Sequence, residues 1–240
     1  MGAYFAYYLT GIFVIPVLIF SLVAQGMVKR RFRKYSSVLS RTNMTGAQAA
    51  YRLLQLNGIT DVSIQQTGGN LTDNYNPKNK VISLSEGVYN STSVAAIGIA
   101  CHEAGHACQH ANAYAPLAFR NFVIPVTRVG SWLGVPLVII GTIISSRFAV
   151  STNIGYYIAL FGLVLYSFVA LFQFITLPVE FNASRRALET IRDNGFLVED
   201  EYDGAKKVLT AAALTYVAAL ASSVVTLLRL FIVLSGSRRR

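Results

Sequence analysis

Apolar residues in this chain gather in four long stretches that alternate with more polar regions. The stretches cover residues 3–25, 129–146, 155–177 and 208–234, and the only charge within them is Arg229 in the last. A helix of about 20 apolar residues is long enough to cross the roughly 30 Å hydrocarbon core of a bilayer. The pattern therefore predicts a mainly α-helical integral membrane protein with about four transmembrane helices.

The region 29–120 differs from these stretches because its elements are shorter and more mixed. Apolar residues at helical spacing predict a helix over 45–57, with its first residue as N-cap and a glycine directly after it. Alternation of apolar and polar residues predicts strands at 62–67 and 80–85. A longer helix is expected over 93–113. We therefore expect one small α+β region attached to the transmembrane helices, in a single domain over residues 1–240.

The basic residues indicate how the chain is oriented. Charged residues make up only 13% of the sequence, yet the formal net charge is +10, from 21 Lys+Arg and 11 Asp+Glu. Fifteen of the basic residues lie in 29–120 and 178–207, and one lies in the loop 147–153. Because cytoplasmic loops of membrane proteins carry the excess of Lys and Arg, both segments are expected in the cytoplasm. The basic run 29–34 is interpreted as contact with anionic lipid headgroups rather than with nucleic acid.

The sequence His102-Glu103-Ala104-Gly105-His106 places two histidines four residues apart with a glutamate between them. On a helix such residues share one face and lie about 6 Å apart along the axis, so both imidazoles can reach one metal ion. Glu103 then stands where it can take a proton from water. Histidine pairs at this spacing also occur without a metal, but all three histidines of this chain lie within nine residues.

A catalytic zinc site needs a third protein ligand, and the chain offers two candidates. His110 continues the helical ladder, but it lies about 12 Å along the axis from His102, too far for Zn–N bonds of about 2.0–2.1 Å. Glu180 follows the third apolar stretch, on the side of the membrane predicted for the histidines. A carboxylate beside a bilayer is costly without a partner. From the residues alone, an ion pair with Arg185 or Arg186 explains Glu180 equally well.

The chain resembles the bacterial membrane-bound neutral zinc metallopeptidases of the YugP type over nearly its whole length. The resemblance is carried by residues 73–77, 82–85, 102–109 and 180–186. It implies that His102, His106 and Glu180 bind one zinc ion and that Glu103 is the general base. It also implies an integral protein of the bacterial cell membrane, and the distribution of basic residues predicts that the active site is on the cytoplasmic side. One departure is Asn182, where we expect Asp in the family.

Further residues are candidates for roles around such a site. An oxyanion-stabilising group is needed, and hydrogen-bond partners usually orient metal ligands. The candidates for one or the other role are Tyr75, Ser184, Arg185 and Arg186. The strand 80–85 precedes the predicted long helix, and we expect it to be an edge strand to which an extended substrate adds by main-chain pairing. The residues of this predicted substrate strand are Val81, Ile82, Ser83 and Leu84.

These features lead to one expected function and one alternative. The expected function is a zinc-dependent, membrane-embedded endopeptidase that cleaves protein substrates at or near the cytoplasmic membrane face. The alternative is a non-catalytic membrane scaffold or small transporter with a structural metal site. A closed set of four ligands would favour the alternative, whereas an open coordination position would favour the peptidase.

Overall fold

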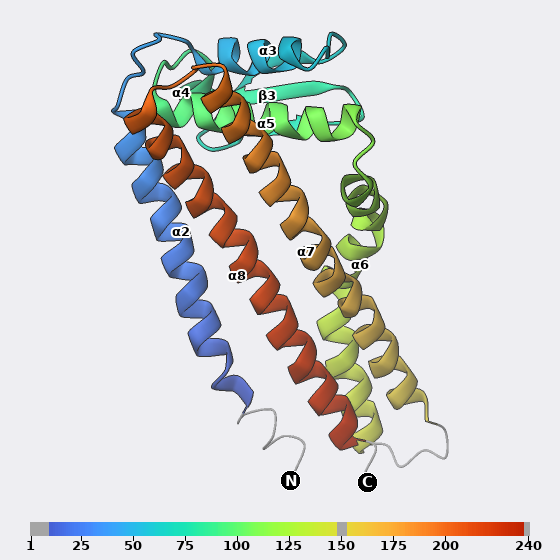
Figure 1. Cartoon of the computed structure of the whole chain (residues 1–240). Coiled ribbons are helices and arrows are strands. Elements are labelled where there is room, and N and C mark those ends of the chain that lie inside the picture. The colour runs from blue at the N-terminus through green and yellow to red at the C-terminus, as the bar shows by residue number, and fades with distance from the viewer. Residues whose placement is uncertain (1–9, 148–152, 238–240) are drawn as a thin grey trace. The chain divides into compact units, whose positions relative to one another are not determined.

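The computed structural model describes residues 10–147 and 153–237 of the 240-residue chain (Figure 1). Seven helices and three strands lie within the described residues. In chain order they are α2 Val14–Ser36, α3 Gly46–Leu56, β1 Ser63–Thr67, β2 Asn74–Asn76, β3 Val81–Ser85, α4 Glu86–Tyr89, α5 Val94–Ala111, α6 Ala115–Arg147, α7 Ile154–Asp193 and α8 Glu199–Ser237.

Contacts divide the chain into two compact units. We call residues 1–23, 119–177 and 216–240 the apolar unit, and residues 24–118 and 178–215 the mixed unit. All three strands and helices α3, α4 and α5 belong to the mixed unit, whereas the long helices contribute residues to both.

Three helices are long and apolar enough to cross a membrane. They are α6 over Ala115–Ser146, α7 and α8 over Glu199–Gly236, and they contain the predicted spans 129–146, 155–177 and 208–234. The first predicted span, 3–25, begins outside the described residues, and its remainder lies at the start of α2 and just before it. Most of the loop 147–153 and the tail 238–240 also lie outside the described residues.

Glycines allow α6 and α7 to pack closely within the apolar unit. A methyl group at Gly162 would lie 2.7 Å from both the carbonyl oxygen of Gly134 and Cβ of Leu137, closer than real methyl groups approach. Small residues at such crossings let two helix backbones meet, which is how many transmembrane helices associate. Large apolar side chains point outward instead, with Phe122 78% and Trp132 79% exposed. An exposed apolar surface of this kind suits a lipid environment.

The strands of the mixed unit form one three-stranded sheet in the order β1-β3-β2. β1 pairs with β3 in parallel, with Ser63 opposite Val81, and β2 pairs with β3 antiparallel, with Tyr75 opposite Ile82. The predicted strands 62–67 and 80–85 are therefore confirmed to within a residue. The prediction that 80–85 is an edge strand is wrong, because β3 is the central strand and is bonded on both sides.

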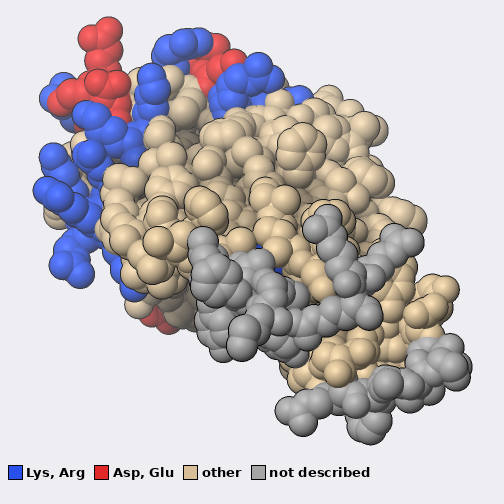
Figure 2. Space-filling model, turned by 90° about the horizontal axis from the view of Figure 1, so that it is seen from below, with Lys and Arg blue, Asp and Glu red and all other residues tan. Residues whose placement is uncertain are grey.

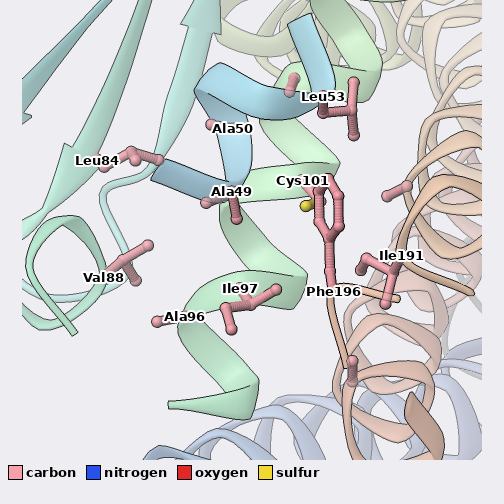
Figure 3. Packing of buried hydrophobic residues seen from close by; sticks show 14 of the residues in the cluster. Ala49, Ala50, Leu53, Leu84, Val88, Ala96, Ile97, Cys101, Ile191 and Phe196 are labelled. Carbon is pink, nitrogen blue, oxygen red and sulfur yellow. The ribbon is translucent and has the colours of Figure 1, made fainter. Parts of the chain in front are cut away.

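Helix α5 is the centre of the mixed unit, and α3 and β3 pack against it. Figure 3 shows this core, in which Phe196 reaches toward Cys101 of α5 and Ala49 and Leu53 of α3 lie nearby. The neighbours can approach from many directions because α5 is rich in alanine and glycine. Cys101 and Cys108 are free, buried thiols, and burial raises the pKa of the Cys108 thiol to about 11.

Local signals in the sequence place the helix ends of the mixed unit. Thr45 is the N-cap of α3, with its side chain accepting from the backbone N–H of Gln48 while the Gln48 side chain accepts from the backbone N–H of Thr45. Ser93 caps α5 in the same position and accepts from the backbone N–H of Ala96. Both predicted helices, 45–57 and 93–113, are thereby confirmed within two residues.

Candidate metal centre

The candidate site lies in the mixed unit where α5 meets the part of α7 that follows Pro178. α5 carries His102, Glu103 and His106, and α7 carries Glu180. Gly105 makes the close approach possible, because a methyl group there would lie 2.6 Å from the carbonyl oxygen of Ala183. The glycine inside the motif is therefore a packing requirement of the site.

The side chains of the two histidines and Glu180 converge. The Nε2 atom of His102 lies 3.3 Å from Oε2 of Glu180, and the Nε2 atom of His106 lies 3.6 Å from the same oxygen. The ligand atoms of the three residues all lie within 4.8 Å of one another. The side chains are 14%, 10% and 5% exposed for His102, His106 and Glu180, so the group is sheltered but reachable from solvent.

The other ring nitrogen of each histidine is engaged by a neighbour. Nδ1 of His102 lies 3.0 Å from the hydroxyl oxygen of Ser184, and Nδ1 of His106 lies 3.0 Å from Oε1 of Gln109. Metal-binding histidines are commonly held in this way, by a partner on the nitrogen that faces away from the metal. Both Nε2 atoms therefore remain directed at Glu180.

The donor set fits zinc. Two imidazole nitrogens and one carboxylate oxygen are ligands that catalytic zinc sites use, with a further position left for water or substrate. Within residues 10–147 and 153–237, the group contains three ligand residues, and no further Asp, Glu, Cys or His joins it. The observed separations of 3.3 and 3.6 Å between Nε2 and Oε2 are already close to those of two ligand atoms that share one ion through bonds of about 2.0–2.2 Å.

Comparison with known proteins agrees with this geometry. The family described as "Putative neutral zinc metallopeptidase" matches residues 10–235. The chain belongs to the neutral zinc metallopeptidase family. A Bacillus subtilis (strain 168) protein described as "Putative membrane protease YugP" is 43% identical over 224 residues, which cover 93% of this chain and 96% of the relative. No solved structure matches the chain significantly. The resemblance stated from the sequence is thus confirmed, and the family is one of hydrolases.

The glutamate of the motif in this metallopeptidase is buried beside the ligand group. Glu103 is 8% exposed on α5, and burial raises the pKa of its carboxyl above the ordinary value. It is near enough to His102, His106 and Glu180 to interact with them electrostatically. A buried carboxylate beside the ligand group is positioned to exchange protons there.

His110 and Tyr75 pair with each other beyond the ligand group. The hydroxyl of Tyr75 on β2 lies 2.8 Å from Nδ1 of His110, near the end of α5. His110 is outside the group of candidate ligands, whereas Glu180 is inside it. His110 therefore lies apart from the candidate ligands, as its distance from His102 along the helix predicts.

The remaining candidate residues differ in whether they contact the proposed metal ligands. Ser184 contacts His102 directly, whereas Arg186 donates from Nε to Oδ1 of Asn182 at 2.9 Å. Arg185 is exposed and lines a groove of about 360 Å³ between α7 and α8. The four substrate-strand candidates, Val81, Ile82, Ser83 and Leu84, lie on the central strand β3.

Two groups of polar residues near the site were not predicted from the sequence. Gln109 and Asn182 bond to each other, with Nε2 of Gln109 lying 3.0 Å from Oδ1 of Asn182. Asp73 accepts hydrogen bonds from the backbone N–H and hydroxyl of Ser85, which fastens the start of β2 to the end of β3. The position of Gln109 three residues after His106, on nearly the same helix face, is the one signal that could have identified it.

Proposed function

We propose that this family member is a zinc-dependent, membrane-embedded endopeptidase that hydrolyses peptide bonds of protein substrates. The observation that carries the proposal is the convergence of His102 and His106 on one oxygen of Glu180, with Glu103 beside them. The matched family and the description of the Bacillus relative as a membrane protease support it.

The residues would divide the work of hydrolysis between them. His102, His106 and Glu180 would hold the ion, which supplies Lewis acidity toward the peptide carbonyl and lowers the pKa of water. Glu103 accepts a proton from the attacking water on its carboxylate and delivers it to the leaving amine. The buried surroundings of Glu103 support this role, because a raised pKa makes its carboxylate a stronger base for the proton of the attacking water in the first step.

An extended substrate would pair with β2 rather than with the central strand. In the described sheet the outer edge of β2 has no partner strand, and β2 packs against α5. The contact between Tyr75 and His110 holds this edge along the helix that carries the motif. Main-chain pairing there would present a peptide bond to the site independently of most of its side chains.

The number of ligands argues against a purely structural metal. Structural zinc sites are closed by four protein ligands, whereas three ligand residues gather among the described residues of this chain. A scaffold or transporter with a structural ion is therefore the weaker alternative. Membership of a metallopeptidase family points the same way.

The proposed location is the bacterial cell membrane, with the site on the cytoplasmic side. The support is the charge distribution, because fifteen basic residues flank the site in 29–120 and 178–207 and only one lies in the loop 147–153. The substrates would then be proteins exposed at, or embedded in, that face of the bilayer. The bilayer itself is a partner of the three candidate spans.

Glu103→Gln tests the reaction, because the change keeps the shape of the side chain and removes its ability to accept a proton. We expect the purified variant to retain its zinc and to lose peptide hydrolysis by a factor of about 10² or more. Zinc content and cleavage of a peptide library are measured on the same samples. Loss of zinc from the variant, or activity close to wild type, would contradict the assignment of Glu103 as a base.

The proposed side of the membrane is tested by single cysteines in a background that lacks Cys101 and Cys108. Asn79→Cys lies between β2 and β3, and Ser151→Cys lies in the loop between the second and third predicted spans, outside the described residues. We expect a membrane-impermeant thiol reagent to label only Ser151→Cys in intact cells. Labelling of Asn79→Cys from outside would place the site on the opposite face.

A further inference from the structure

Gln109 is a fully buried polar residue at the junction of α5 and α7. Its exposed fraction is 0%, and every polar atom of its side chain has a partner. Oε1 lies 3.0 Å from Nδ1 of His106, while Nε2 lies 2.7 Å from the carbonyl oxygen of Val179 and 3.0 Å from Oδ1 of Asn182. One side chain thus joins a proposed metal ligand to the helix that carries Glu180.

The partners decide which way the Gln109 amide points. The oxygen and nitrogen of an amide have almost the same shape, so their positions follow from the hydrogen bonds that they make. A backbone carbonyl can only accept, so the Gln109 atom that faces Val179 must be the NH₂ group. Oδ1 of Asn182 accepts from Nε of Arg186, which can only donate, and it therefore also accepts from Gln109.

The orientation of the Gln109 amide requires a proton on Nδ1 of His106. Both N–H groups of Gln109 are directed at α7, so only its carbonyl oxygen faces the imidazole. That oxygen cannot donate, and the 3.0 Å contact is a hydrogen bond only if Nδ1 of His106 carries the proton. We infer that Gln109 is a positioning residue that holds His106 in the tautomer with a lone pair on Nε2, ready for a metal ion. The inference rests on the proposed zinc site.

The second histidine is not held in the same way. His102 faces the hydroxyl of Ser184, which can donate or accept and therefore permits either tautomer. Gln109 and Ser184 thus provide a matched pair within one site. Loss of a hydrogen-bond partner of a metal-binding histidine typically weakens metal binding 10- to 100-fold. We expect Gln109→Met to fall in this range and Ser184→Ala to have a smaller effect.

Two substitutions separate tautomer control from simple packing. Gln109→Met keeps the approximate volume but removes the acceptor for His106 and both donors toward α7. Gln109→Glu also loses the NH₂ group but keeps an oxygen opposite Nδ1 of His106. Zinc affinity is measured by competition with a chelator, and the melting temperature is measured on the zinc-free proteins.

We expect both variants to melt below wild type, because each loses the NH₂ donors that bond to Val179 and Asn182. Zinc affinity should fall at least about tenfold in Gln109→Met, and by less than about tenfold in Gln109→Glu. Equal losses of affinity in the two variants would overturn the inference, since Gln109 would then act only by joining α5 to α7.

The tautomer can also be observed without any metal. The chain has only three histidines, so selective ¹⁵N-histidine labelling gives few signals, and His110→Ala removes one of them. At alkaline pH, where imidazoles are neutral, we expect His106 to carry its proton on Nδ1 in the zinc-free wild type and to become a mixture in Gln109→Met. An unchanged tautomer in that variant would refute the role of Gln109. If the wild-type protein bound no zinc, the proposed function would fail, while this measurement would still decide what Gln109 does.

Discussion

The two units of the molecule differ in the number and the sign of their charged residues. All 11 Asp and Glu residues of the chain lie in the mixed unit, whereas the described residues of the apolar unit carry four charges, all of them arginines. They are Arg120, Arg128, Arg147 and Arg229. Charged side chains likewise gather in one part of Figure 2, and wide areas of the described surface beside them carry none.

Both units nevertheless use the same means of bringing helices together. Gly162 lets α6 and α7 meet in the apolar unit, and Gly105 lets α5 and α7 meet in the mixed unit. In the first case the meeting residues are apolar and the result is packing alone. In the second, the contact brings Glu180 to His106. Close helix packing therefore forms a candidate ligand site only where polar side chains lie next to the helix crossing.

The largest effect should come from removing the carboxylate of Glu180, which the close contact of α5 and α7 at Gly105 brings near the histidines. Glu180→Ala removes one of the three candidate ligands, and we expect zinc affinity to fall by at least about tenfold. This loss should exceed that from removing a typical hydrogen-bond partner of a metal ligand. His110→Ala should leave the zinc stoichiometry intact, because His110 bonds to Tyr75 instead. Metal analysis after dialysis against a chelator compares the two. An empty site in His110→Ala, with tightly bound zinc in Glu180→Ala, would reverse the ligand assignment.

A smaller effect is expected from closing the space at the crossing in the mixed unit. Gly105→Ala adds a methyl group 2.6 Å from the carbonyl oxygen of Ala183, so α5 and α7 must separate. Overpacking of this kind costs about 1–3 kcal/mol, and it should weaken zinc binding as well because Glu180 moves with α7. Gly87→Ala on α4 is the control, since an added methyl group meets nothing within 4 Å there. Equal zinc affinity in both variants would show that the crossing does not position the ligand.

The smallest effect on the site should come from the corresponding change in the apolar unit. Gly162→Ala places a methyl group 2.7 Å from the carbonyl oxygen of Gly134, which should lower the stability of the α6–α7 pair by about 1–3 kcal/mol. Zinc affinity should stay at the wild-type value. Unfolding in mixed micelles measures the loss of stability. Gly26→Ala on α2 is the control, because an added methyl group meets nothing within 4 Å there. A loss of zinc binding in Gly162→Ala would show that the two units are energetically coupled.

Much of the mixed unit could be predicted because its signals are local. Thr45 and Gln48 cap α3 through contacts three residues apart, and the motif of α5 falls on a helix whose cap, Ser93, is visible in the sequence. The alternating pattern also located β1 and β3 to within a residue. In each case, the interaction that determines the element lies within a few neighbours along the chain.

The features that could not be predicted depend on partners far away in sequence. β3 is central because β1 joins it in parallel and β2 joins it from the other side, and no pattern within 80–85 records this. α7 continues past the apolar run to Asp193, because Pro178 removes one backbone hydrogen bond without ending the helix. The helix stops shortly before Gly195, which has a φ of +64°. Gln109 resembles any helical glutamine until Val179 and Asn182 are placed beside it.

The edges of the small sheet also affect how the protein behaves in a crowded membrane. β1 exposes Ser63, Gln65 and Gln66, and β2 is three residues long with an asparagine at each end. Short, polar edge strands give a neighbouring molecule few main-chain groups and little apolar surface to join. The sheet is therefore guarded against self-association and fibril growth, although a peptide anchored elsewhere on the protein could still pair briefly with β2.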